Sequence, residues 1–339
     1  MNRRNFLSVS MATLGAGAAL GAGLLPRRAL AGPKYTLKMA NVNAASSHIS
    51  INGYDKFAEF AAAKSNGEIV VHHFPGGQLG SDKETYEAAQ QQLLEISCGS
   101  FANIVTLTRA FEVLHLPYIF ETREQAHRAV DAAAVKDAVN QELNKIGLHW
   151  FMIVDYGFRK VGTVSHRVVT PSDLAGLKIR ASRSPTEIAA LNAFGAAATT
   201  VDWPEVYNAL KLKVVDGEFI PPNEFYSSKH YELIKYITNV DCQWLASIGV
   251  MSLDKWNSYP EDVRRILEEA AAEAQALNRE AWVGYTEKTI ADMKAAGDEF
   301  IDVEPEVIAQ WQEAGRSVWA KSGVPQEVID LVRREATTA

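Results

Sequence analysis

Strand and helix patterns alternate in the first third of the chain, and this alternation constrains the possible folds more than any other feature of the sequence. Short, largely apolar segments typical of strands occur at Tyr35–Ala40, Glu68–Phe74 and Glu95–Phe101. An apolar stripe over Ile51–Ala61 predicts a helix between the first two strands, and the capping box Ser81-Asp-Lys-Glu84 predicts the start of another. Strands joined by helical crossovers form parallel sheets, so the pattern predicts an α/β fold.

Several residues follow these strands at the edge where a parallel sheet binds ligands. That edge lies beyond the carboxyl ends of the strands. The residues that the order of elements places there are Asn41, Asn43, Ser46, Ser100, Phe101 and Asn103. Asn43 and Ser100 are therefore candidate ligand contacts, and an ordinary role in a strand-end turn is the alternative for Asn43.

One very long helix is predicted in the last third of the chain. The helical pattern continues from Pro260 to Ala296 without a break signal until Gly297. At ~1.5 Å per residue such a helix is longer than about 50 Å, which exceeds the width of one small domain. The sequence therefore predicts two domains that this helix bridges.

Local patterns predict four further elements. Pro221 and Pro222 make regular structure unfavourable between Glu218 and Tyr226, which suggests a rigid loop there. The others are a helix from Thr122 to Gly147, a capping box from Asp202 to Glu205 and a strand from Tyr236 to Trp244.

The first 31 residues have the pattern of an export signal. A twin-arginine motif, Arg3-Arg4-Asn5-Phe6-Leu7, precedes a glycine-rich apolar run, and Ala29-Leu30-Ala31 forms a cleavage site. The apolar run from Val9 to Leu25 is short for a membrane span, which needs ~20 apolar residues. We therefore expect residues 1–31 to be a twin-arginine signal peptide and the mature protein to be periplasmic.

The charge of the mature chain argues against nucleic acid as a partner. Cleavage removes four arginines and no acids, so the formal net charge changes from -7 to -11, with 30 basic and 41 acidic residues left. A protein this acidic repels polyanions. An anionic ligand would have to be bound by arginines placed locally against the overall field.

Motifs for catalysis and metal binding are absent from the sequence. It has no nucleophile elbow, no phosphate-binding loop of the Walker type and no HExxH motif, and its eight histidines lack metal-ligand spacing. Asp216 and Glu218 lie on one strand face as in a glycosidase, but an Asp-Gly strand end is the commoner origin of such a pair. Cys98 and Cys242 lie in apolar runs typical of buried free thiols, and a disulfide between them is the alternative in an oxidising compartment. We therefore expect that the protein is not an enzyme and that it binds neither a metal nor a cofactor.

Arg180 is the strongest candidate for binding an anion. Leu177 and Ile179 predict a short strand that ends at Arg180, and the rigid fork of guanidinium donors matches a carboxylate bidentately. The alternative is a structural ion pair with an Asp or Glu in a strand-end turn, and the residue by itself leaves both possibilities open.

Seven motifs in order, taken together, resemble one known family. They are Gly77-Gln-Leu-Gly80 followed by Asp82, Leu116-Pro-Tyr-Ile-Phe120, Gly157-Phe-Arg159, Thr170-Pro-Ser-Asp-Leu-Ala-Gly-Leu-Lys-Ile-Arg180, Trp203-Pro-Glu-Val-Tyr-Asn-Ala-Leu210, Val215-Asp-Gly217 and Tyr226-Ser-Ser-Lys-His-Tyr-Glu232. Over Lys34 to Glu335 the chain resembles the periplasmic solute-binding proteins of TRAP transporters, the DctP type.

The resemblance implies the two-domain periplasmic binding protein fold, type II-like, with an interdomain ligand cleft and a domain-spanning helix. The expected domain I comprises residues 34–157 and 246–280, and domain II comprises residues 158–245 and 281–339. The implied function is an extracytoplasmic receptor that captures a small organic acid and delivers it to the membrane subunits of a TRAP permease. A periplasmic sensing subunit for a membrane receptor is the alternative, followed by an exported hydrolase.

The resemblance also implies site residues. Arg180 is expected to clamp the ligand carboxylate with Arg159 as second donor, while Trp203 and Asn43 also contact the ligand. Each has a structural alternative: Arg159 pairs with Asp155 or another acid, and Trp203 is helix-start core.

One departure from the family concerns the wall of the cleft. The family's frequent amide three residues after Asp-Gly is Ile220 here. Asn223 and Glu224 are candidates to compensate, and a solvated surface position is the alternative for Glu224. The aromatic and aliphatic residues Trp203, Phe219, Ile220 and Phe225 suggest a ligand with a substantial apolar body. His48 and His230 are expected to be surface or capping residues.

Overall fold

The computed structural model describes residues 32–338. The twin-arginine motif and the cleavage site lie outside the described residues, so the export signal stays a prediction.

The first sheet is assembled from the alternating segments at the N-terminus and two later strands. Its order is β2-β1-β3-β10-β4, and β1 pairs in parallel with both β2 and β3, as the sequence predicts. β10 runs antiparallel between β3 and β4, so the carboxyl ends of β1, β3 and β4 share one edge. The bounds are β1 Tyr35–Ala40, β2 Ile69–Phe74, β3 Ile96–Ser100, β4 Leu148–Phe158 and β10 Trp244–Ser252.

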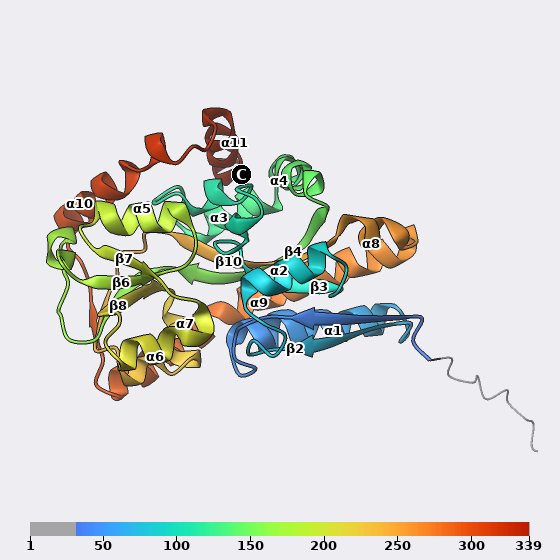
Figure 1. Cartoon of the computed structure of the whole chain (residues 1–339), viewed down its shortest axis with the longest axis horizontal. Coiled ribbons are helices and arrows are strands. Elements are labelled where there is room, and N and C mark those ends of the chain that lie inside the picture. The colour runs from blue at the N-terminus through green and yellow to red at the C-terminus, as the bar shows by residue number, and fades with distance from the viewer. Residues whose placement is uncertain (1–31, 339) are drawn as a thin grey trace, which may run out of the picture. The chain divides into compact units, whose positions relative to one another are not determined.

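The second sheet has the order β11-β9-β5-β8-β6-β7. β6, β7 and β8 are mutually parallel, and β5 is antiparallel to its neighbours β8 and β9. Figure 1 shows α5 on one side of β6, β7 and β8, with α6 and α7 on the other. The bounds are β5 Lys160–Thr163, β6 Lys178–Ala181, β7 Ala197–Thr200, β8 Gly217–Ile220, β9 Tyr236–Thr238 and β11 Glu299–Ile301.

The described residues form eleven α-helices, besides seven short 3-10 or π-helical segments. The capping box at Ser81 is present, because the Glu84 carboxylate accepts a bond from the Ser81 amide while the Ser81 hydroxyl accepts one from the Glu84 amide. The helices are α1 Asp55–Lys64, α2 Asp82–Gln90, α3 Arg123–Asp131, α4 Ala133–Lys145, α5 Pro185–Ala193, α6 Val206–Lys211, α7 Pro222–Ser227, α8 Leu253–Ser258, α9 Glu261–Ala295, α10 Pro305–Arg316 and α11 Gln326–Thr337.

The long helix α9 packs against both parts of the structure. It begins after Pro260 and spans 35 residues, or about 50 Å at ~1.5 Å per residue. It packs against α1 and β4 of the first sheet's layer and against α7, which follows β8 of the second sheet. The chain also passes from one sheet to the other directly, between β4 and β5 and between β9 and β10. The two sheets are therefore connected at several points.

Four local predictions are wrong. Asp202 does not cap a helix, because its carboxylate accepts two bonds from the Arg183 guanidinium, a stronger interaction than a cap. The segment around Pro221 and Pro222 is regular: Pro221 follows β8, and Pro222 occupies the first position of α7, where a proline is tolerated. The helix predicted from Thr122 to Gly147 is interrupted by extended backbone at Ala132. The strand predicted over residues 236–244 ends at Thr238, and Trp244 belongs to β10.

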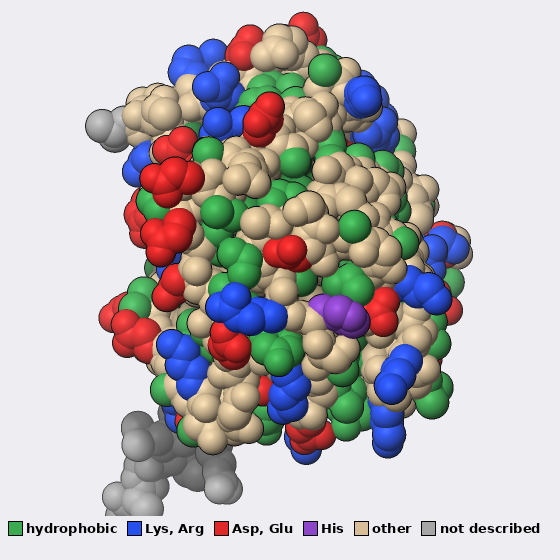
Figure 2. Space-filling model, turned by 90° about the vertical axis from the view of Figure 1, so that its left-hand side faces the viewer, with side chains coloured by type: hydrophobic (Ala, Val, Ile, Leu, Met, Phe, Trp, Pro, Cys, Tyr) green, Lys and Arg blue, Asp and Glu red, His purple; other side chains and the backbone are tan. Residues whose placement is uncertain are grey.

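Charged side chains of both signs share the visible surface, and both cysteines are buried. On the face shown in Figure 2, Lys and Arg side chains are interspersed with Asp and Glu side chains rather than gathered into a basic surface. Within residues 32–338 no helix has the length and apolarity needed to cross a bilayer, and no three His, Cys, Asp or Glu side chains cluster as metal ligands would. Cys98 and Cys242 are buried free thiols, as predicted.

Gly157 lies where the chain passes from the first sheet to the second, and it tests how tightly α9 packs there. Its φ is +98°, and a Cβ atom would lie 2.6 Å from Cζ2 of Trp282 on α9. We expect Gly157→Ala to lower the free energy of unfolding by about 3 kcal/mol, measured by urea denaturation, because backbone strain and overpacking add.

Gly147→Ala is the matched control. Gly147 also has a positive φ, +74°, but a Cβ there would meet no heavy atom within 4 Å, so only the backbone term of about 1 kcal/mol applies. Equal decreases in the free energy of unfolding for Gly157→Ala and Gly147→Ala would show that the Trp282 ring moves aside without an energetic cost.

Candidate ligand-binding site

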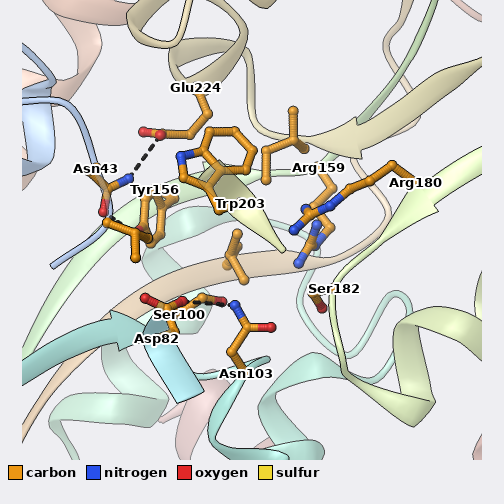
Figure 3. Close-up of a pocket in the computed structure, with 13 residues that line it drawn as sticks. Asn43, Asp82, Ser100, Asn103, Tyr156, Arg159, Arg180, Ser182, Trp203 and Glu224 are labelled. Carbon is orange, nitrogen blue, oxygen red and sulfur yellow. Dashed lines mark hydrogen bonds between the residues drawn. The ribbon is translucent and has the colours of Figure 1, made fainter. Parts of the chain in front are cut away.

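A pocket lies where the carboxyl ends of β1, β3 and β4 face those of β6 and β8 (Figure 3). The space between its walls is about 340 Å³, including space open to solvent, of which about 30 Å³ admits the centre of a water molecule. The pocket is therefore narrow in this conformation. Its lining residues are Val42, Asn43, Asp82, Ser100, Asn103, Tyr156, Arg159, Arg180, Ser182, Trp203, Ile220, Glu224 and Leu245.

Arg180 reaches the pocket from β6 and pairs with no carboxylate of the described residues. It is only 2% exposed, although it carries a charge. Its Nε donates to the Val201 carbonyl at 2.9 Å, and its guanidinium carbon lies 5.5 Å from the centre of the Trp203 ring. No hydrogen bond to another described residue involves Nη1 or Nη2, so four of its five N–H donors are free to bind a ligand.

Arg159 lies between β4 and β5, and most of its donors are already used. Its Nη1 donates to Glu187 Oε1 at 3.1 Å and to the Phe219 carbonyl, and its Nη2 lies 3.0 Å from Glu187 Oε2. Its Nε donates to His115 Nε2 at 3.2 Å. Only one N–H of Nη2 is left for a ligand, so Arg159 can donate at most one bond there.

Burial weakens the hold of Arg159 on its proton. Burial lowers the pKa of Arg159 to about 10, the Glu187 carboxylate opposes this change, and the neighbouring Arg180 charge reinforces it. At neutral pH Arg159 is still charged, and the buried Glu187 balances that charge. The expected alternative of a structural ion pair thus applies to Arg159, with Glu187 rather than Asp155 as the acid.

Trp203 presents its ring to the pocket from the turn before α6. The ring lies 5.0 Å, centre to centre, from the His230 ring, and His230 Nδ1 is 2.7 Å from Glu218 Oε1. The prediction that His230 is a surface or capping residue is wrong, because it is 2% exposed and packs against Trp203. His48 is also buried, and its Nε2 is bonded to the Asn278 carbonyl of α9.

Asn43 connects Tyr156 and Glu224 on the other side of the pocket. The Tyr156 hydroxyl donates to Asn43 Oδ1 at 2.8 Å, and Asn43 Nδ2 donates to Glu224 Oε2 at 2.9 Å. Glu224 is therefore not a solvated surface residue, since it is 2% exposed. Burial raises the pKa of Glu224 to about 7, although the bond from Asn43 favours the ionised form.

Asp82 is a second acid in the lining, and it is supplied by the first residue of α2. Its Oδ2 accepts bonds from Asn103 Nδ2 at 2.8 Å and from the Ser100 amide at 3.2 Å. Burial raises the pKa of Asp82 to about 6, while these bonds and the Arg180 charge lower it in part. Asp82 thus fixes the carboxyl end of β3 at the pocket.

Seven of the nine predicted contacts come together in the lining. They are Asn43, Ser100, Arg159, Arg180, Trp203, Ile220 and Glu224. Phe219 instead packs its ring against Phe194 in the core, where the ring centre lies 5.7 Å from the Arg159 guanidinium carbon, and its carbonyl accepts from Arg159. Asn223 faces α9, where its amide bonds the hydroxyls of Thr286 and Thr289.

The sequence did not single out four polar lining residues as contacts: Asp82, Asn103, Tyr156 and Ser182. Each adjoins a residue or motif that the sequence did identify, since Ser182 follows the Arg180 strand and Tyr156 precedes Gly157. Phe225 lies in the core against Gly162 and is not part of the lining. Of the four residues of the expected apolar wall, Trp203 and Ile220 line the pocket, and Val42 and Leu245 add two further apolar side chains.

Comparison with known proteins places the chain among solute-binding proteins. Residues 39–325 match the sequence profile of the family described as bacterial extracellular solute-binding protein, family 7. The chain is 34% identical over 263 residues to the C4-dicarboxylate-binding periplasmic protein DctP of Rhodobacter capsulatus, covering 77% of this chain and 78% of that protein. It is 28% identical over 256 residues to the 2,3-diketo-L-gulonate-binding periplasmic protein YiaO of Escherichia coli, covering 76% and 77%.

Solved structures agree with these matches. A TRAP periplasmic solute-binding protein of Sulfurospirillum deleyianum with bound succinate superimposes with a TM-score of 0.82 at 26% identity, covering 91% of this chain and 100% of that one. Another from Ochrobactrum anthropi, with its C-terminus bound in the ligand-binding pocket, gives 0.79 at 29% identity, covering 90% and 95%.

Replacing Glu224 by Gln tests the buried carboxyl group. Because folding raises the pKa of Glu224 from 4.5 to about 7, the folded state binds this proton more tightly, and that stabilisation is lost as the pH rises from 4.5 through 7. We expect Glu224→Gln to raise the free energy of unfolding relative to the original protein, little at pH 4.5 and by about 3 kcal/mol at pH 8. Urea denaturation across this range without ligand measures the difference.

Glu205→Gln removes the same charge from an exposed position on the turn that carries Trp203. This control measures the effect of losing one exposed carboxylate over the same pH range. A difference between Glu224→Gln and the original protein that stays constant from pH 4.5 to 8 would contradict the prediction.

Proposed function

The chain belongs to the bacterial extracellular solute-binding proteins of family 7, and from this premise we propose that it captures a small organic acid by its carboxylate and delivers it to a TRAP-type membrane permease. The family consists of solute-binding receptors rather than enzymes, so the site is built for retention and not for turnover.

The observation that supports carboxylate capture is the free guanidinium of Arg180. A buried cation without an anionic partner is unfavourable, and a bound carboxylate would supply that partner through charge-assisted hydrogen bonds. Arg159 would add one further bond, and its ion pair with Glu187 would keep it fixed beside Arg180. The Trp203 ring would cover one face of the bound group.

Two lobes would close on the ligand. We propose that the lobes are those expected from the sequence, residues 34–157 with 246–280 and residues 158–245 with 281–339. The direct passages between the sheets, at residues 158–160 and 239–243, would serve as hinges, with α9 crossing both lobes. Export by the twin-arginine pathway would place the receptor in the periplasm, where the permease subunits could receive the ligand.

Arg180→Ala tests the proposed clamp. Thermal-shift screening of the purified protein against a panel of small organic acids, including succinate, galacturonate and pantoate, identifies a bound acid, because a ligand at 100 times its Kd stabilises by about 2.7 kcal/mol. We expect Arg180→Ala to weaken binding of that acid by about 3–5 kcal/mol in calorimetric titration, since it removes the buried partner of the carboxylate.

Arg167→Ala is the control, since Arg167 is exposed, pairs with Glu299 and lies outside the pocket lining. It should leave the Kd unchanged. Binding of the same acid within tenfold of the original affinity by Arg180→Ala would contradict the proposal.

A further inference from the structure

The pocket has opposite charges on its two sides. Figure 3 shows the guanidinium groups of Arg159 and Arg180 on one side and the carboxyl groups of Asp82 and Glu224 on the other. All four side chains are at most 5% exposed. A ligand held by its carboxylate at the arginines therefore directs its other end toward two acids.

The acids outnumber the arginines that are free to balance them. Glu187 already neutralises Arg159 through their buried ion pair, so Arg180 is the cation left to face Asp82 and Glu224. A bound monocarboxylate uses the charge of Arg180 and leaves the two acids facing the far end of the ligand. A second ligand carboxylate at that end would add a like charge in a buried site, where repulsion is weakly screened.

Glu224 also offers an acceptor. Its Oε2 accepts one bond from Asn43, and the Ser227 side chain lies beside the carboxylate, which still leaves acceptor capacity for a ligand. Across the pocket, Asp82 Oδ1 is buried beside Gly99 and has no hydrogen-bond partner among residues 32–338. Ionised carboxylates only accept hydrogen bonds, so these oxygens favour ligand groups that donate. Burial raises the pKa of both acids, and a donor from the ligand would favour their ionised forms.

We propose that this site selects a monocarboxylate whose far end carries hydrogen-bond donors, hydroxyl or ammonium groups, and discriminates against dicarboxylates. The inference rests on the proposed carboxylate capture at Arg180 and adds the identity of the opposite end. This ligand preference would distinguish the chain from the C4-dicarboxylate-binding protein of Rhodobacter capsulatus, although the two are 34% identical. The polar lining residues Ser100, Asn103 and Ser182 suit a hydroxylated body better than an alkyl one.

Matched acids that differ only at the far end test the proposal. The four-carbon set is succinate, 4-hydroxybutyrate, 4-aminobutyrate and butyrate, and the hydroxylated pairs are threonate with tartrate and gluconate with glucarate. Calorimetric titration of the purified protein at pH 7.5 should show at least one donor-terminated acid binding tenfold or more tighter than the dicarboxylate of its set. Comparing 4-aminobutyrate with 4-hydroxybutyrate then distinguishes ammonium from hydroxyl.

Substitutions of Asp82 and Glu224 test whether these side chains cause the discrimination between ligands. Glu224→Gln should reduce the preference for the donor-terminated acid over its dicarboxylate to threefold or less, and Asp82→Asn should reduce it in the same direction. Asp82 also anchors Ser100 and Asn103, so Glu224→Gln is the primary variant. Glu205→Gln, which removes one exposed acid, should leave the preference unchanged.

Two results would overturn the inference: dicarboxylates that bind as tightly as their donor-terminated partners in every set, or a preference that Glu224→Gln does not alter. A failure of the proposed carboxylate capture at Arg180 would give a different result from a failure of the proposed selectivity. If succinate binds best and Arg180→Ala abolishes its binding, carboxylate capture stands and only the selection is wrong. If the preferred ligand binds Arg180→Ala normally, capture itself is wrong.

Discussion

The desolvated guanidinium of Arg180 is the constraint on which the site depends. Removing a cation from water is costly unless an anion and hydrogen-bond acceptors replace the solvent. The described residues supply one carbonyl and an aromatic face, but no carboxylate. Arg159, which lines the same pocket, shows the opposite solution, because Glu187 pairs with it internally. The two arginines of one pocket thus differ in the hydrogen-bond donors they have left, because only Arg159 pairs with a buried acid among the described residues.

The two sheets determine where the arginines and the other pocket residues lie. Parallel strands bring their carboxyl ends to one edge, and the direct passage from β4 to β5 places the edges of both sheets at the same pocket. Arg159 lies in that passage, Gly157 precedes it, and Trp282 of α9 packs beneath Gly157. A movement of one sheet relative to the other would therefore change the distance between the arginine side of the pocket and the Asn43–Glu224 side, which is the geometry that a closing receptor requires.

Membership of a family of solute-binding proteins fixes the general activity, while the lining determines which solute is preferred. Solved relatives of this fold carry different acids, among them succinate and galacturonate. The proposed capture at Arg180 would place few demands on the rest of the ligand. The wall opposite the arginine would then decide which acid is preferred, and that wall carries Asp82, Glu224 and the amide of Asn43. The Ile220 position, by contrast, supplies only an apolar surface.

The sequence by itself determined the α/β class, the parallel pairing of β1, β2 and β3, the long helix and Arg180 at a strand end, because periodicity, capping and strand order are local signals. Strand order and the family resemblance together predicted seven of the residues that line the pocket. Only the tertiary structure decided which side chains pair. It assigned Glu187 to Arg159, Asp202 to Arg183 and His230 to Glu218, turned Phe219 and Asn223 away from the pocket, and buried Glu224 beside Asn43. The partners in these pairs are between 12 and 181 residues apart, so contacts made on folding, which no local pattern encodes, decide them.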